Sequence, residues 1–131
     1  GSAEELNRLK QDVQVSLKSK NIRDNRVGEY LVSSYGRQAI DIISEIKDME
    51  SYPSGLIEAE LNYCLEHEMV CRASDFLVRR TGRLYFNLAE AKSQLHFVIS
   101  RMAVYHNWDQ NRIESEEREM HKLFEEAITF V

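Results

Sequence analysis

The sequence predicts an all-α fold, a single compact bundle of six to seven short-to-medium helices. Three observations predict it. Apolar residues recur at spacings of three and four along most of the 131 residues, which places them on one face of a helix. No segment alternates between apolar and polar residues for long enough to make a strand. One proline and five glycines are too few for the many tight turns of a strand-rich fold.

The first three helices are predicted from apolar stripes and end signals. The first is expected over residues 4–18. The second follows Asp24, whose carboxylate can cap a helix N-terminus, and ends at Gly36, because glycine tolerates the left-handed conformation. The third is expected over residues 37–48, before a loop at residues 49–55. The inward-facing residues are predicted to be Leu6, Leu9, Val13 and Leu17, then Val27, Tyr30, Leu31 and Tyr35, then Ala39, Ile42, Ile43 and Ile46.

The fourth and fifth helices lie on either side of a short polar connection. The fourth is expected over residues 56–69. Ser74 is the predicted N-cap of the fifth, residues 75–81, with Asp75 favourably placed in its first turn. Gly82 is expected to break this helix. The apolar face of the fourth helix is predicted to consist of Ile57, Leu61, Cys64, Leu65 and Met69.

The last two helices also begin at capping residues. Asn87 and Glu90 have capping-box spacing and open the sixth helix. Asp109 opens the seventh, whose first half, residues 114–119, is charged nearly all round and is expected to be the more exposed half. The inward faces are predicted to be Leu88, Ala91, Leu95, Val98, Ile99, Met102 and Tyr105 in the sixth helix, and Ile113, Met120, Leu123, Phe124, Ala127, Ile128 and Val131 in the seventh.

Charge and composition narrow the classes of function. The net charge is −5, with 17 basic and 22 acidic residues, so nucleic acid is a poor partner. No apolar run approaches the roughly 20 residues that a membrane span needs. Two cysteines without a secretory signal favour reduced thiols in the cytoplasm. Residues 1–3 are interpreted as a cloning scar.

The segment from Glu58 to Met69 is the densest in chemical groups, and one interpretation of it is a metal site. Cys64, His67 and Cys71 are spaced by three and four residues, so a continuous helix would place them on one face. Thiolate and imidazole suit zinc, but a fourth ligand and the usual pair spacings are absent. Buried, inert cysteines are therefore the favoured interpretation.

Carboxylates of the same segment could instead act in catalysis or pair with arginines. A general acid or base needs a pocket and a partner, and no Gly-x-Ser-x-Gly, P-loop or Gly-x-Gly-x-x-Gly pattern accompanies them. Arginine can hold a carboxylate through two hydrogen bonds and so fix two packed helices. Structural pairing is favoured, and no catalytic, cofactor-binding or metal residue is assigned. The predicted partners of the carboxylates are Arg72, Arg79, Arg80 and Arg83.

The aromatic and histidine residues outside this segment carry weaker signals. His96, His106 and His121 are scattered and have no acidic or cysteine partner at ligand spacing. Trp108, just before Asp109, is interpreted as an anchor for the helix junction; the alternative is a contact patch, where tryptophan is enriched.

Two boxes in order make the sequence recognisable. Glu58-Ala59-Glu60-Leu61, Tyr63 and Glu66-His67-Glu68-Met69 form the first, and Ser74-Asp75-Phe76-Leu77-Val78-Arg79-Arg80-Thr81-Gly82 begins the second, which continues to Phe86. Together they resemble the C-terminal domain of the FAD-dependent glycerol-3-phosphate dehydrogenase and α-glycerophosphate oxidase family. Two flanking stretches are also similar, Tyr30 to Gly36 and Asn107-Trp108-Asp109.

The resemblance implies an accessory role. Parent enzymes of this family bind FAD and oxidise sn-glycerol 3-phosphate to dihydroxyacetone phosphate, with oxygen or a quinone as acceptor. Their flavin and substrate residues lie in an N-terminal portion that this chain does not contain. Residues 4–131 are therefore expected to be one helical C-terminal domain, inactive by itself, with no cofactor of its own and FAD in the parent. Its partner would be the N-terminal FAD-binding portion of the same polypeptide, and glycerol 3-phosphate would be met only through the parent.

The boxes would then serve as a structural or interdomain lock. The expected location of the parent is cytoplasmic, with peripheral association at the inner face of the membrane left open. The alternative function is an independent helical protein-interaction module. The residues assigned to the lock are Glu58, Glu60, Tyr63, Glu66, His67, Glu68, Asp75, Arg79, Arg80 and Thr81.

Overall fold

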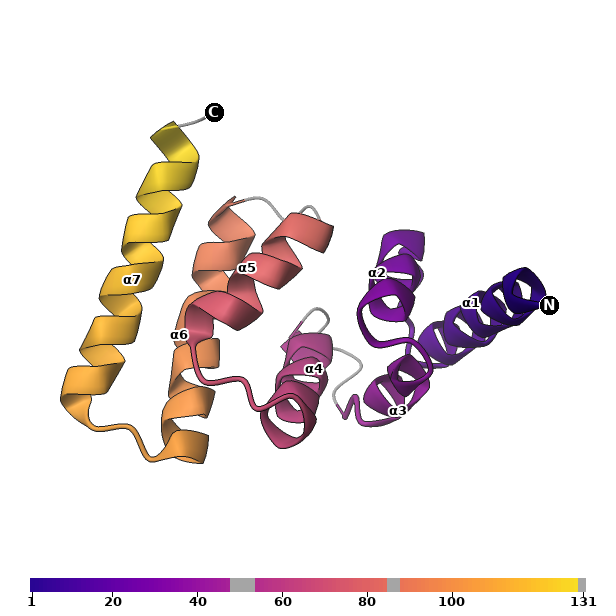
Figure 1. Cartoon of the computed structure of the whole chain (residues 1–131), viewed down its shortest axis with the longest axis horizontal. Helices are drawn as coiled ribbons and strands as arrows, with labels where there is room; N and C mark the ends of the chain where they lie inside the picture. Colours follow the sequence, from indigo (N-terminus) through magenta and orange to yellow (C-terminus); the bar gives the residue numbers. More distant parts are fainter. Residues whose placement is uncertain (48–53, 85–87, 130–131) are drawn as a thin grey trace. The chain divides into compact units, whose positions relative to one another are not determined.

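The computed structural model of the chain describes residues 1–47, 54–84 and 88–129, and these ranges form seven α-helices and no strand (Figure 1). The predicted all-α class is confirmed. Contacts divide the chain into two compact units, Gly1–Tyr63 and Cys64–Val131, and the fourth helix runs through the boundary. The helices are α1 (Ser2–Ser19), α2 (Asn25–Tyr35), α3 (Gln38–Ser44), α4 (Ser54–His67), α5 (Ala73–Leu84), α6 (Leu88–His106) and α7 (Gln110–Thr129).

In the first unit, α1 packs against both α2 and α3. The predicted end signals of α2 are confirmed: the Asp24 carboxylate accepts the backbone N–H of Arg26 at 3.0 Å, and Gly36 ends the helix at a φ of 58°. A capping oxygen satisfies one of the free N–H groups of the first turn, which is why the helix starts there. The buried apolar residues of this unit include Val13, Leu17, Ile22, Val27, Leu31, Ala39, Ile42, Ile43, Leu56, Ile57 and Leu61.

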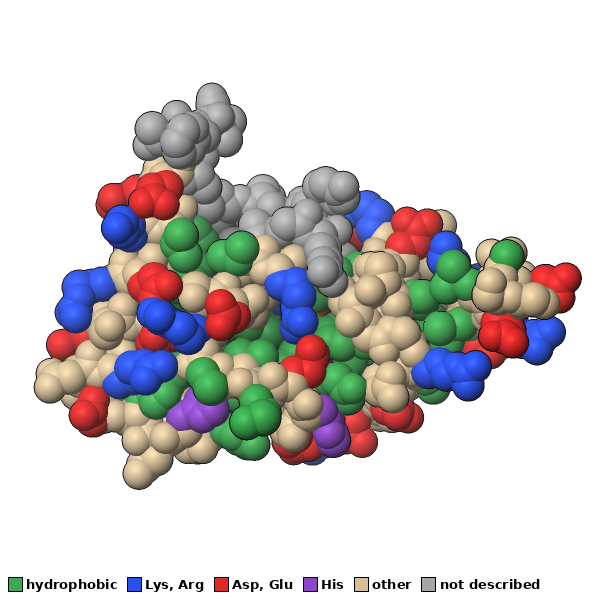
Figure 2. All heavy atoms as spheres, viewed as in Figure 1, with side chains coloured by type: hydrophobic (Ala, Val, Ile, Leu, Met, Phe, Trp, Pro, Cys, Tyr) green, Lys and Arg blue, Asp and Glu red, His purple; other side chains and the backbone are tan. Residues whose placement is uncertain are grey.

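In the second unit, α5 packs against α6 and α7, which run side by side in opposite directions (Figure 1). Asp109 opens α7 as predicted, because its Oδ1 accepts the N–H of Arg112 at 2.8 Å. On the face seen in Figure 2, acidic and basic side chains are interspersed along α7. The buried apolar residues of this unit include Cys64, Leu65, Ala73, Phe76, Leu77, Leu95, Val98, Ile99, Met102, Met120 and Phe124.

Several predicted helix boundaries differ from the structure. α3 ends at Ser44 instead of continuing to 48, and the next N–H groups, of Glu45 and Ile46, bond carbonyls only three residues back. α5 begins at Ala73, so Ser74 is not its N-cap, and it continues through Gly82 to Leu84. A glycine inside a helix costs only about 1 kcal/mol, which packing of the apolar face can offset. Asn87 of the predicted capping box lies outside the described residues.

Burial confirms most of the predicted inward faces and corrects three positions. Leu6, Met69 and Tyr105 were expected inside, but all three are exposed. α1 buries only Val13 and Leu17, both beyond its midpoint, so its first turns have little to pack against. Met69 lies after the last residue of α4 and therefore leaves the helical face. The side chains of Leu88, Ala91, Ala127, Ile128 and Val131 lie outside those described.

The charged first half of α7 contains one buried exception. Residues 114–119 were expected to be the more exposed half, and Glu114, Ser115 and Arg118 are exposed, but the side chain of Glu116 is only 2% exposed. Within the described residues, no helix is both long and apolar enough to cross a bilayer.

Candidate functional site

The first polar cluster is built around Glu60, a fully buried carboxylate on α4. Its Oε2 accepts hydrogen bonds from the hydroxyls of Tyr30 and Tyr35, the latter at 2.6 Å. Both tyrosines belong to α2, so the cluster joins α2 to α4 within the first unit. The structure thus brings together the stretch from Tyr30 to Gly36 and the box around Glu60, although Tyr35 and Glu60 lie 25 residues apart in the sequence.

The tyrosine rings also contact one another. Tyr35 meets Tyr30 edge to face, with ring centroids 6.3 Å apart, and meets Tyr63 of α4 in the same manner at 5.6 Å. Edge-to-face contacts add about 0.5–1.5 kcal/mol beyond area burial. A buried carboxylate is costly unless it is hydrogen-bonded, and two hydroxyl donors on one oxygen meet much of that need. Glu60 and its three tyrosines, the tyrosine–Glu60 cluster, therefore specify how α2 meets α4.

The second cluster, in the other unit, contains Cys64, Glu68 and Arg79. The Arg79 guanidinium lies 3.4 Å from Glu68 Oε2 and donates to the Cys64 Sγ at 3.1 Å. The thiol of Cys64 in turn lies 3.5 Å from Glu68 Oε1. These contacts bring α5 against the C-terminal end of α4. Glu68 and Arg79 are two of the residues that the sequence assigns to the lock.

The third cluster was missed by sequence reasoning and centres on Glu116 of α7. Its Oε1 accepts the backbone N–H of Ala73, the first residue of α5, at 2.8 Å. Its Oε2 lies 3.2 Å from the Nε of Arg112 and 3.6 Å from the Nε of Arg72. A carboxylate at a helix N-terminus satisfies a free N–H and interacts favourably with the helix dipole. Glu116 therefore caps α5 from another helix.

The same cluster fixes the loop between α4 and α5. Arg112 donates a further hydrogen bond to the carbonyl of Cys71 at 3.0 Å, and Arg72 also pairs with Glu119. Arg72 was expected to face the carboxylates of residues 58–69; it pairs with α7 instead. The i, i+4 spacing of Arg112 and Glu116 was readable from the sequence, but the contact with Ala73 spans 43 residues and was not.

The remaining residues assigned to the lock are dispersed. Glu66 and His67 are both exposed, and their charged ends lie 3.8 Å apart. Asp75 is exposed in the first turn of α5, as expected. Arg80 is fully buried, with its guanidinium carbon 5.8 Å from the centre of the Phe76 ring.

Two further assignments, Glu58 and Thr81, complete the set. Glu58 on α4 is half-buried. Thr81 lies in α5, and its side chain is outside those described, as is that of Arg83. Glu60 and Arg80 belong to different units, so a pairing between them stays a prediction.

The zinc interpretation loses its geometric premise. Cys71 lies four residues past the end of α4 at His67, so no continuous helix carries Cys64, His67 and Cys71 on one face. Cys64 is buried and Cys71 is exposed, and neither forms a disulfide. No group of three metal-ligating side chains occurs in the part of the chain that the structure describes.

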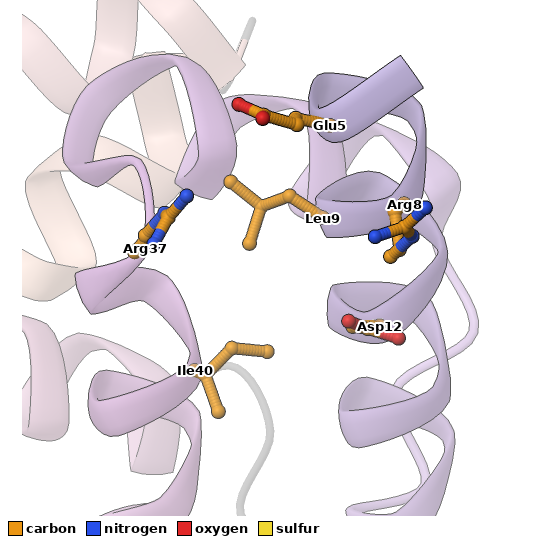
Figure 3. A pocket seen from close by; sticks show the side chains of 6 residues that line it. All are labelled: Glu5, Arg8, Leu9, Asp12, Arg37 and Ile40. Carbon is orange, nitrogen blue, oxygen red and sulfur yellow. The ribbon is translucent and has the colours of Figure 1, made fainter. Parts of the chain in front are cut away.

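A surface hollow of about 320 Å³ lies between α1 and α3 of the first unit. Figure 3 shows Leu9 and Ile40 projecting into it from the two helices, with charged side chains around them. Two acids and two arginines contribute opposite charges, so the hollow favours neither anions nor cations. The lining residues are Glu5, Arg8, Leu9, Asp12, Arg37 and Ile40.

Comparison with known proteins identifies the family to which the sequence is similar. Residues 2–113 match the family described as the C-terminal domain of alpha-glycerophosphate oxidase. The chain is 33% identical over 109 residues to an aerobic glycerol-3-phosphate dehydrogenase of Staphylococcus epidermidis, a match that covers 81% of this chain and 20% of the relative. The corresponding protein of Staphylococcus aureus is 32% identical over 107 residues, covering 79% and 19%. No solved structure matches. The chain thus spans about a fifth of the length of these curated relatives.

Proposed function

We propose a function from one premise: the chain belongs to the family of C-terminal domains of alpha-glycerophosphate oxidase. It is a non-catalytic helical accessory domain of an FAD-dependent enzyme that oxidises sn-glycerol 3-phosphate to dihydroxyacetone phosphate, and it packs on the flavoprotein body of the same polypeptide. The family match over residues 2–113 is the observation that carries this proposal. The identity to two aerobic glycerol-3-phosphate dehydrogenases supports it.

The use of the buried polar groups supports a structural role for this chain. Glu60 accepts hydrogen bonds from two tyrosines, and Glu116 accepts a backbone N–H and contacts two arginines. Each of these carboxylates is hydrogen-bonded to side chains or backbone that fix helix packing. A general base, by contrast, must reach a substrate proton. We assign Glu60 and Arg80, which are buried, and Arg79, which is half-buried, to domain stability.

The exposed members of the lock have a different role. Glu66, His67 and Asp75 face solvent and are available to a partner surface. We assign them to the contact with the rest of the polypeptide. Charges at the rim of an interface govern orientation and association more than affinity, so single substitutions there should leave the fold intact.

The remaining assignments follow from the same premise. FAD and glycerol 3-phosphate belong to the N-terminal portion of the parent polypeptide, and nucleic acid is not a partner. The parent works in the cytoplasm or peripherally at the inner face of the membrane. Its electron acceptor is oxygen or a quinone.

The open reading frame that encodes the chain provides the test. The proposal predicts a Gly-x-Gly-x-x-Gly turn after a strand, upstream of residue 4, because a dinucleotide needs glycines there for close approach of the pyrophosphate. It also predicts that the purified 131-residue chain is colourless and does not oxidise glycerol 3-phosphate. Flavin absorbance or activity in the chain alone would refute the division of labour. A reading frame without a flavin-binding region would favour an independent interaction module.

A further inference from the structure

Three non-glycine residues among those described have a left-handed backbone, and one of them is unusual for it. Asn21, Asn107 and Met69 have φ values of 64°, 56° and 53°. Asparagine is common in this conformation at helix ends, and Asn21 and Asn107 follow α1 and α6. The methionine side chain cannot make the local hydrogen bond with which asparagine offsets the crowding of its Cβ. The backbone of Met69, just after α4, is therefore strained.

The side chain of Met69 does not offset this strain within the chain, because it is 82% exposed. Glycine or asparagine would fit this backbone conformation better. Neither would reduce the covering of the core, because the Met69 side chain covers little of it. Strained positions persist where the surrounding structure over-determines them, and they cluster at functional sites. An exposed, flexible thioether is also a side chain that adapts well to partner surfaces.

The segment after Met69 is held firmly against α6 and α7. The carbonyl of Val70 accepts a hydrogen bond from His106 Nε2 at 2.8 Å, and that of Cys71 accepts one from Arg112 at 3.0 Å. Glu116 then fixes Ala73. Met69 is thus presented from an ordered segment, which lowers the entropy cost of binding.

Aromatic and cationic side chains surround this segment at the α6–α7 junction. Tyr105 is 52% exposed and meets the His106 ring edge to face at 5.1 Å. His106 stacks on Trp108 at 5.7 Å, and the guanidinium of Arg112 lies 4.8 Å from the centre of the Trp108 ring. Figure 2 shows hydrophobic side chains and a histidine together at the surface over the C-terminal end of α6. Tyrosine, tryptophan, arginine and methionine are enriched in protein interfaces, and the first three are also enriched among hot spots.

We infer that this surface, formed by Met69, Tyr105, His106, Trp108 and Arg112, is the docking face for the remainder of the polypeptide. The inference rests on the proposed function. The remainder of the polypeptide is the occupant because the relatives are about five times as long as the matched region, so a large body of each relative lies outside that region. The family match, residues 2–113, includes all five residues. That body would cover the exposed side chains of Met69 and Tyr105.

Oxidation of methionine by hydrogen peroxide tests the inference within the complete polypeptide. Met69 is exposed, whereas Met102 and Met120 are buried within the second unit and serve as internal controls. We expect Met69 to form sulfoxide at least about tenfold more slowly in the complete polypeptide than in the 131-residue chain, the factor that about 1.4 kcal/mol of docking energy produces. Peptide mass spectrometry measures each site separately.

Two variants sharpen the test. Tyr105→Ser should restore rapid oxidation of Met69 in the complete polypeptide, while Val15→Ser, at an exposed valine of α1, should not. Met69→Gly in the isolated chain should raise the melting temperature, because it relieves the strained backbone.

The possible failures are distinguishable. Equal oxidation of Met69 in the chain and in a flavin-containing complete polypeptide would overturn the docking face and leave the proposed function standing. Absence of flavin from the complete polypeptide would overturn the proposed function itself. Protection of Met69 in the isolated chain that increases with concentration would identify a second copy as the occupant and would contradict the inference.

Discussion

At the scale of the residue, Glu60 is the side chain whose removal is expected to destabilise the chain most. Glu60→Ala should destabilise the chain by about 3–5 kcal/mol, because it removes the acceptor of two buried tyrosine hydroxyls and leaves a void. Tyr30→Phe removes one donor and should cost only about 1 kcal/mol, since Tyr35 remains. Urea unfolding of both variants measures these values. A cost below about 0.5 kcal/mol for Glu60→Ala, the range of ordinary surface substitutions, would contradict the role of the tyrosine–Glu60 cluster.

Asp24 supplies a dependence on pH. The hydrogen bond from the Arg26 side chain lowers the pKa of Asp24 from its ordinary value of 3.8, outweighing partial burial, which raises it. A depressed pKa in the folded state contributes stability above the unfolded value, and this contribution is lost as pH falls through the folded pKa. Asp24→Asn keeps a good cap but loses the charge. The difference in free energy of unfolding between wild type and Asp24→Asn should therefore have its complete value at pH 7 and become smaller below pH 3.8.

Urea titrations of wild type and Asp24→Asn at pH 7 and at pH 3 check this expectation. Asp12, an exposed aspartate of α1, provides a matched control through Asp12→Asn, whose effect should be small at both values of pH. A difference for Asp24→Asn that stays constant over this range would show that the carboxylate acts only as a cap.

Whether the role of a residue can be predicted from the sequence depends on how far along the chain its partner lies. Asp24, Gly36 and Asp109 were predicted because a cap acts on its own helix, within a few residues. Glu116 was not, because its main partner, the N–H of Ala73, lies 43 residues away. A charged residue among other charges gives no sign in sequence that the fold will bury it.

At the scale of the element, the start of α5 depends on α7. Glu116→Ala should cost about 2–4 kcal/mol, since it exposes a helix N-terminus without a partner and leaves Arg72 and Arg112 without a shared carboxylate. Glu126→Ala, an exposed glutamate on the same helix, should stay within about 0.5 kcal/mol. Hydrogen exchange of the first turn of α5 is the direct measurement. Unchanged protection in Glu116→Ala would remove Glu116 as the cap.

Helix positions were predictable, and some of their ends were not. The apolar periodicity placed all seven helices, because burial of one face drives each of them. α5 starts before Ser74 and continues past Gly82, because its N-terminus is capped from α7 and one glycine costs little. Met69 was placed on the face of α4 by spacing alone, but the helix ends two residues earlier.

At the scale of the whole molecule, sequence resemblance and structure contribute different things. The two boxes indicated the family, and the match over residues 2–113 shows it. The boxes alone could not say which side chains are inside: Glu60 and Arg80 are buried, whereas Glu66 and His67 face solvent. Likewise, the exposed surface at Met69 and Tyr105 was hidden in the sequence, because both residues fit an apolar stripe.

The central claim is that the redox chemistry belongs to a flavoprotein body and that this chain is its accessory domain. Anaerobic titration with glycerol 3-phosphate, followed by absorption spectroscopy, tests it on the complete polypeptide and on the 131-residue chain in parallel. The account predicts a flavin spectrum in the complete polypeptide that glycerol 3-phosphate bleaches, and no flavin spectrum in the chain. A flavin bound by the chain itself, or a complete polypeptide whose spectrum does not respond to glycerol 3-phosphate, would contradict it.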